Sequence, residues 1–342
     1  MALTIQTRFI DTVSAKLPWL PRHFIMPLAV ALVLIPTLTV LGFSYGPMLS
    51  VQPESGTLSG GAVSTADTNA SGGQSIRFNT PGSCPNASQT PGGDDGMGGC
   101  WPYEGNTGVP AGTSLTIYNG DYTISTDGTL VENMDIRGCV IVQAANVTIR
   151  KSKVTCTSFI GLASYAASDD GGLILEDVEI DCADNNTTGL SYIGVTARRL
   201  HVHNCENGLN IDDDVSIADS YIHSIYEGAT GHGDGIQGVA NSNVTISHNT
   251  IYAESTTAAI NLNNNPTGPS STNVLISNNL LAGGGWTMYC PVVATVNYQI
   301  LNNRFSRFFH PNVGVAGPAT DCGNETQSGN VYHETGAPLF LQ

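Results

Sequence analysis

Side chains that can do chemistry gather in the glycine-rich stretch GHGDGIQG at residues 231–238. His232 can carry a proton near neutral pH, and Asp234 can act as an acid, a base or a cation ligand. Gly233 and Gly235 would let a ligand approach the backbone closely. The alternative is a tight turn in which Asp234 hydrogen-bonds its own backbone. The stretch therefore predicts either a catalytic turn or a structural one.

The acidic run NIDDD ends at Asp214, about one predicted coil before this stretch. We expect Asp212 and Asp213 to share catalysis with His232 and Asp234. Glycoside hydrolysis uses two carboxyl groups about 5–9.5 Å apart, and adjacent strands lie about 4.8 Å apart. Asp212 and Asp234 could therefore form such a pair if they share a face. No cofactor is required, although a calcium ion held by Asp212, Asp213 and Asp214 would offset their repulsion; the alternative is a solvated turn.

Polar side chains that could hold a substrate lie on the short strands around these carboxylates. Strand side chains alternate in direction, so Asn210, Gln237 and Asn261 should point outward while their apolar neighbours point inward. Tyr289 could stack on a sugar ring, and Arg198 could neutralise a uronate. The alternative for Arg198 is a surface turn, and one ring near Tyr289 could belong to the core.

The elements that must position these residues are short, repeated apolar runs. They are VTIRKSKV (147–154), LILEDVEI (173–180), LHVHNCEN (200–207), VSIADSYI (215–222), VTISHNTI (244–251), VLISNNLL (274–281) and YQILNNRF (298–305). A repeat of 20–50 residues is typical of a solenoid, although the 15-residue step from 200 to 215 is short for a full coil. We expect amides to stack in a ladder at the turns, at Asn204, Asn249, Asn278 and Asn302.

Composition and charge narrow the class of protein. Charged residues make up 12% of the chain, and 12 Lys+Arg face 28 Asp+Glu, for a net charge of -16. Nucleic-acid binding is not expected, because such proteins need a basic surface. The acidity is typical of a soluble secreted surface.

The N-terminal part predicts export. Residues 24–43 are free of charge for long enough to span a bilayer. The basic residues before them place a short segment, 1–23, in the cytoplasm. A cleaved signal peptide is the alternative, and both interpretations export the rest of the chain. Residues 45–110 are rich in Gly, Ser, Thr and Pro and predict a flexible stalk, whose last third could fold against the start of the domain at 113–342.

Eight cysteines agree with an exported chain, and none forms a CxxC motif. An even count predicts disulfides between sequence neighbours. The expected pairs are Cys84–Cys100, Cys139–Cys156, Cys182–Cys205 and Cys290–Cys322.

From these repeats, residues 113–335 resemble the right-handed parallel β-helix superfamily, which includes pectate lyases, polygalacturonases and alginate epimerases. The resemblance implies an all-β, single-stranded right-handed solenoid, here preceded by one transmembrane helix. Polygalacturonases carry Asn-Thr-Asp-Gly, then an Asp pair, then Gly-His-Gly and Arg-Ile-Lys. Asp234-Gly235 could match the first motif, but no Asp pair follows on the next coil. Alternatively, Asp212-Asp213 matches the Asp pair and His232 the later Gly-His-Gly, but Arg-Ile-Lys is absent. The Asp-Pro-His-Asp motif of alginate epimerases is also absent.

Two functions follow as expectations. The first is a membrane-tethered extracellular enzyme that acts on a polysaccharide as a lyase, hydrolase or epimerase. The second is a non-catalytic adhesin or glycan-binding module. The same solenoid serves both classes, so the fold alone does not decide between them.

Overall fold

The computed structural model describes residues 84–86, 90–165, 172–192, 194–227, 232–254, 256–263 and 270–342, together with the backbone of 62–66 and 74–78. The predicted cytoplasmic segment 1–23 and membrane span 24–43 lie outside these residues. Within the described residues, no helix is long and apolar enough to cross a membrane. Strands β1 (Ala62–Ala66) and β2 (Gln74–Phe78) form a separate two-stranded sheet.

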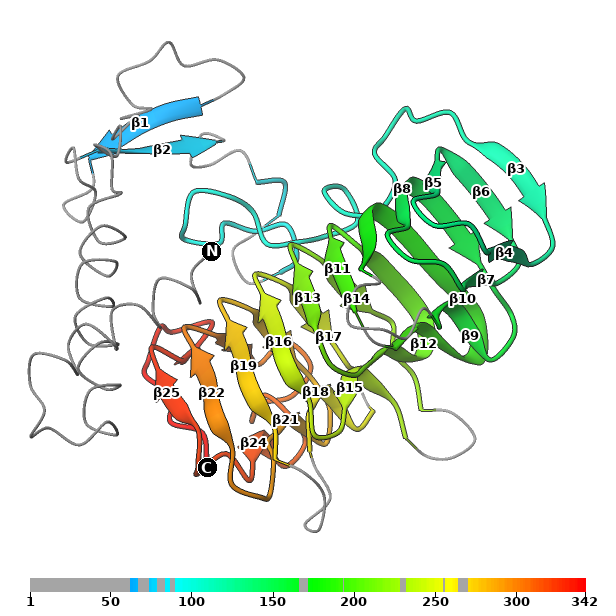
Figure 1. The fold of residues 1–342 in the computed structure, drawn as a ribbon. Coiled ribbons are helices and arrows are strands. Elements are labelled where there is room, and N and C mark those ends of the chain that lie inside the picture. The colour runs from blue at the N-terminus through cyan, green and yellow to red at the C-terminus, as the bar shows by residue number, and fades with distance from the viewer. Residues whose placement is uncertain are drawn as a thin grey trace, which may run out of the picture. The chain divides into compact units, whose positions relative to one another are not determined.

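Strands of successive coils pair in parallel and build three ladders, here called sheets A, B and C (Figure 1). Each coil passes through A, then B, then C, so that a strand commonly pairs with the third strand after it. The long strands β8, β10 and β12 bend at the corners and belong to more than one sheet. This pairing is that of a parallel β-helix, and it confirms the predicted all-β coil.

Sheet A contains β5 (Leu130–Glu132), β8 (Thr148–Thr155), β10 (Leu173–Tyr192), β11 (Val195–Arg198), β13 (Val215–Ala218), β16 (Ser242–Ser247), β19 (Thr272–Ser277), β22 (Val296–Leu301) and β25 (Thr326–Ser328). Sheet B contains β3 (Thr116–Asn119), β6 (Met134–Arg137), β8, β10, β12 (His201–Ile211), β14 (Tyr221–His223), β17 (Thr250–Tyr252), β20 (Leu280–Ala282), β23 (Arg304–Ser306) and β26 (Val331–Tyr332). Sheet C contains β4 (Tyr122–Ile124), β7 (Val140–Val142), β9 (Ile160–Ser164), β10, β12, β15 (Asp234–Gly238), β18 (Ala258–Asn261), β21 (Trp286–Tyr289) and β24 (Gly317–Thr320).

The core lies inside the coils and is built by side chains that stack in register. One such column in sheet A is buried throughout: Ile149, Leu175, Ala197, Ile217, Ile246, Ile276 and Ile300. Alternation along each strand turns the neighbouring polar residues outward. The short step from residue 200 to 215 also has an explanation. The run at 200–207 enters sheet B, whereas the run at 215–222 begins in sheet A of the next coil.

An amide ladder runs through the corner between sheets A and B. It consists of four buried residues: Asn249, Asn279, Asn303 and Asn330. The prediction was right for Asn249 and wrong for the other three positions. Asn278 and Asn302 adopt φ of 55° and 56° and make the bend itself, so the next residue turns into the corner. Asn204 lies at a different corner and donates to Asp181.

All four predicted disulfides are confirmed: Cys84–Cys100, Cys139–Cys156, Cys182–Cys205 and Cys290–Cys322. The last three join positions 17, 23 and 32 residues apart, which is close to one coil. Each of these three therefore links neighbouring coils at one end of a sheet.

The segment of residues 90–112, here called the strap, packs on the outer face of sheet B. Trp101 is buried against Tyr252, Leu280 and Ala282 of the later coils. Further along, the backbone N–H of Gly108 donates to the carbonyl of Arg199 at 2.8 Å. The end of the predicted stalk is therefore part of the folded domain, because its apolar ring finds a site on the sheet. These contacts are made with coils later than the start of the domain, where the sequence suggests that this segment packs.

Candidate functional site

The outer face of sheet C carries a row of polar side chains in strict register. Asn210 of β12 pairs with Gln237 of β15, which pairs with Asn261 of β18 and then with Tyr289 of β21. The predicted substrate-binding residues on this sheet are therefore neighbours in one row. Their spacing is that of parallel strands, about 4.8 Å from one coil to the next.

A pocket of about 410 Å³ opens at one end of this row. Its lining residues are Phe159, Ile160, Thr188, Ser191, Asn210, Ile211, Asp212, Gln237, Gly238 and Val239. Phe159 and Val239 are exposed and supply apolar surface. Asn210 donates to the hydroxyl of Thr188 at 3.3 Å, and within the described residues its buried Oδ1 has no hydrogen-bond partner. The pocket lining thus contains an amide oxygen whose capacity to accept a hydrogen bond is unused within the described residues.

Asp234 lies beneath this face and is fully buried. Its Oδ2 is 3.2 Å from Nδ1 of His232 and accepts from the amide of Asn261 at 3.3 Å. Burial raises the pKa of Asp234 to about 7. The structure brings His232 and Asp234 together, as the sequence suggests, but it places the carboxyl group away from solvent.

The glycines around Asp234 serve packing between coils. A Cβ at Gly235 would lie 2.4 Å from the Ile251 side chain and 2.5 Å from the carbonyl oxygen of Ala259. A Cβ at Gly233 would meet the carbonyl oxygen of Tyr226 at 2.5 Å. The close approach at both positions is made by the protein itself, so the expected ligand approach is not what these glycines provide.

The structure does not bring Asp212 and Asp234 together. Asp234 begins β15, whereas Asp212 follows Ile211, which pairs with Gly238 at the other end of that strand. At about 3.3 Å per residue, the two positions lie well over 10 Å apart along the sheet. A pair of carboxyl groups 5–9.5 Å apart would require them at the same height on adjacent strands.

The other two residues of the acidic run have partners of their own. Asp213 accepts from the backbone N–H of Ser242, and burial raises its pKa. Asp214 accepts from the side-chain amide of Asn243 at 2.8 Å. Within the described residues, Asp212, Asp213 and Asp214 are not among the groups whose ligand atoms converge on one point. The three carboxylates of the predicted calcium site therefore do not converge on one point in this part of the structure.

Arg198 lies on sheet A, not on the face that carries the row of amides. Its Nε donates to Asp219 of the next coil at 2.8 Å. The predicted contact between Arg198 and a substrate on sheet C is not assembled, since the two sheets form different sides of the coil.

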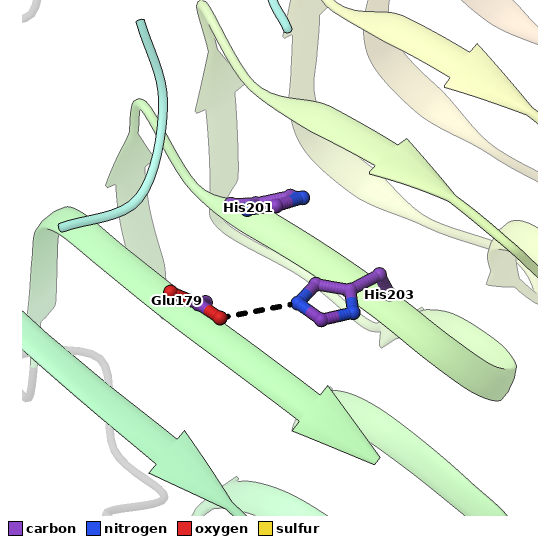
Figure 2. A group of neighbouring side chains, drawn as sticks. All are labelled: Glu179, His201 and His203. Carbon is purple, nitrogen blue, oxygen red and sulfur yellow. Dashed lines mark hydrogen bonds and ion pairs between the residues drawn. The ribbon is translucent and has the colours of Figure 1, made fainter. Parts of the chain in front are cut away.

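A second cluster, whose members no sequence motif links, lies on the outer face of sheet B (Figure 2). It combines Glu179 of β10 with His201 and His203 of β12, and one ligand atom from each lies within 4.8 Å of the others. Lys153 forms an ion pair with Glu179 at 2.7 Å, and His223 continues the row of rings. The signal in the sequence was the spacing His-Val-His, which places both imidazoles on one face of a strand.

Electrostatics in this cluster favour an ionised Glu179 carboxylate beside neutral imidazoles at His201 and His223. The contact with His203 is the main reason that the pKa of Glu179 lies at about 2. Burial lowers the pKa of His201 to about 4 and that of His223 to about 3. The Nε2 atoms of these two rings are 2.8 Å apart, so one ring donates a hydrogen bond to the other.

His248 fastens the strap to the coil. It lies between Asp219, 2.7 Å from its Nδ1, and Asp95 of the strap, 3.2 Å from its Nε2. Burial by itself would lower the pKa of His248, but these two carboxylates raise it from 6.5 to about 9. Arg198 also pairs with Asp219 and so shares that carboxylate.

We expect the free energy of unfolding to fall by roughly 2–3 kcal/mol as the pH rises from about 6.5 to 9. The folded state keeps the proton on His248 over this range while the unfolded state releases it, so the contribution is complete below 6.5 and lost above 9. Denaturant titrations at several pH values measure it. In His248→Gln this part of the pH dependence should disappear, and an unchanged profile would contradict the assignment.

Comparison with known proteins adds little to this description. No protein-family model and no curated protein matches the chain. Among solved structures it is similar to the Dettilon tailspike protein (gp208), at 12% identity and a TM-score of 0.26, over 64% of this chain and 55% of that one. The chain thus spans about half the length of that tailspike. The strand pairing itself places the chain among parallel β-helix proteins.

Proposed function

We propose that this protein is an extracellular glycan-binding β-helix that holds a polysaccharide in the pocket on sheet C. The observation that carries the proposal is the register of Asn210 and Gln237 on adjacent strands beside an exposed Phe159. A side-chain amide can both donate to and accept from sugar hydroxyls, and an aromatic ring offers a flat apolar surface. A repeat of such groups along the coil suits a repeating polymer.

Charge favours a neutral glycan over a polyuronate. Among the described residues that line the pocket, Asp212 is ionisable and there is no Lys or Arg. The chain as a whole carries a net charge of -16. A polyanion would be repelled from this face.

Export belongs to the proposal as well. Four disulfides are typical of an oxidising compartment. We further propose that residues 24–43 tether the protein to a membrane, with the coil outside the cell. The coil should be right-handed, because connections between parallel strands of one sheet are almost always right-handed.

The test is affinity electrophoresis of the full chain in gels that contain a soluble glucan, a mannan or polygalacturonate. We expect retardation by a neutral glycan, weakened roughly three- to tenfold by Asn210→Ala or Gln237→Ala, as for the loss of one hydrogen bond. Gln299→Ala, on the outer face of sheet A, is the matched control. Equal effects of all three substitutions, or retardation by polygalacturonate alone, would contradict the proposal.

A carbohydrate-active enzyme is the second candidate. The observation in its favour is the contact of the buried Asp234 carboxyl group with the exposed His232, whose Nδ1 lies 3.2 Å from Oδ2. The pKa of Asp234, raised to about 7, would suit proton transfer through this pair near neutral pH. Assays for new reducing ends and for unsaturated products separate hydrolase, lyase and binding protein. Turnover that is lost in Asp234→Asn, with binding retained, would establish the enzyme instead.

A further inference from the structure

The cluster on sheet B has the geometry of a metal site. Ligand atoms of Glu179, His201 and His203 lie within 4.8 Å of one another, so side-chain rotation can close them onto one ion. Bonds of about 2.0–2.2 Å are typical for zinc with imidazole and carboxylate ligands. Figure 2 shows the carboxylate and the two imidazoles gathered on one face of β10 and β12.

The fold explains why the three residues meet. His201 and His203 are separated by one residue in β12, and alternate residues of a strand project from the same face. Glu179 of β10 is directly in register with His201. The rigid pairing of two strands therefore supplies all three groups, which suits a preorganised site better than a loop would.

Neighbouring groups resemble the outer partners of a metal site. Nδ1 of His203 lies 3.8 Å from Asp181, whose Oδ1 also accepts from Asn204 at 3.0 Å. Nε2 of His201 contacts Nε2 of His223 at 2.8 Å, and Nδ1 of His223 in turn contacts the Ser224 hydroxyl at 2.9 Å. Ligating histidines usually use their second nitrogen for such contacts, which fix the ring orientation.

We propose that Glu179, His201 and His203 bind a divalent transition-metal cation of the zinc type. Two imidazoles and one carboxylate suit zinc and its first-row neighbours, whereas calcium and magnesium prefer oxygen ligands throughout. Three protein ligands leave a coordination position for water or another molecule. This site is separate from the pocket on sheet C and does not depend on glycan binding.

Lys153 and the strap define the surroundings of the ion. The ammonium of Lys153 lies 2.7 Å from Glu179 and 3.7 Å from Asp181, so it neutralises part of the charge that the cation would meet. The strap packs closely against the cluster, since a Cβ at Gly108 would lie 2.8 Å from that of His201. The side of His203 and Lys153 remains partly exposed and gives the ion a way in.

The experiment is titration of the chelator-treated full chain with Zn²⁺ by calorimetry, repeated with Co²⁺ by visible absorption. We expect one ion per chain. His203→Gln and Glu179→Gln should each weaken Zn²⁺ binding by at least about 10–100-fold, because that is the loss when only an outer-shell partner is removed. Lys153→Met should strengthen Zn²⁺ binding several-fold, because the substitution removes the ammonium group that competes with the metal for Glu179.

His232→Gln is the matched control. His232 also contacts a carboxylate, that of Asp234, but it lies beside sheet C and not in the cluster on sheet B. Thermal melting without metal shows whether each variant folds. Should His203→Gln fail to fold, the near-isosteric Glu179→Gln and the gain in Lys153→Met still decide. Unchanged affinity in Glu179→Gln, weaker binding in Lys153→Met, or an equal loss in His232→Gln overturns the proposal.

Discussion

Replacing Asn279 by alanine should lower the free energy of unfolding by about 2–4 kcal/mol, as expected when buried polar groups lose their partners. The Asn279 amide donates to the carbonyl of Ile246 and to Asn303, both at 2.9 Å. Its oxygen accepts from the backbone N–H of Asn249 at 2.9 Å and from the Asn249 amide at 3.0 Å. Alanine leaves that backbone N–H buried without its acceptor, because the corner is closed to water.

Asn278→Gly is the control for this prediction. Asn278 makes the bend with φ of 55°, a conformation that glycine adopts readily, so its replacement should cost less than about 1 kcal/mol. Urea unfolding followed by circular dichroism measures both changes. Similar losses of unfolding free energy in the two variants would mean that any substitution at this corner is destabilising, whether or not it removes the buried hydrogen bonds.

Replacing Trp101 by alanine should cost about 3–5 kcal/mol, the usual loss for a fully buried aromatic side chain. Trp101 is 1% exposed and packs on Tyr252, Leu280 and Ala282. Its ring also stacks on His248, with centroids 5.5 Å apart. These contacts anchor the strap, so the substitution should release it before the coils unfold.

Hydrogen exchange is the direct measurement of strap release. Amides of residues 91–108 should lose protection in Trp101→Ala while those of β16 (Ser242–Ser247) and β19 (Thr272–Ser277) keep it. Phe340→Ala removes an aromatic ring that is 72% exposed and should leave both regions unchanged. Uniform loss of protection through the coils would show that the strap and the coils form one cooperative unit.

Local patterns were enough to predict the coil and its disulfides. Alternating apolar residues such as those of VTISHNTI define which side of a strand is buried, and this alternation survives in any parallel sheet. Cysteines about one coil apart meet because each coil returns the chain to the same corner. At Asn278 and Asn302 the predicted ladder was displaced by one residue, because an Asn-Asn pair leaves open which member makes the bend and which enters the corner.

The candidate sites were harder to predict, because they depend on height along the coil axis and on which sheet a strand joins. Asp212 and Asp234 looked like partners in sequence, yet they lie at opposite ends of one strand pair. Glu179 and His203 are 24 residues apart and had no common motif, yet they contact each other at 3.3 Å.

The sequence by itself determined the parallel coil, the disulfide pairs and the row of amides on sheet C, since these follow from strand alternation and repeat length. The tertiary structure decided which carboxylates meet and which are buried. It also decided that His201 and His203 face Glu179, and that the strap covers sheet B. The physical reason is the register between coils. The turns that connect the strands set which residues of one coil lie beside which residues of the next, and the local alternation of apolar residues does not encode this pairing.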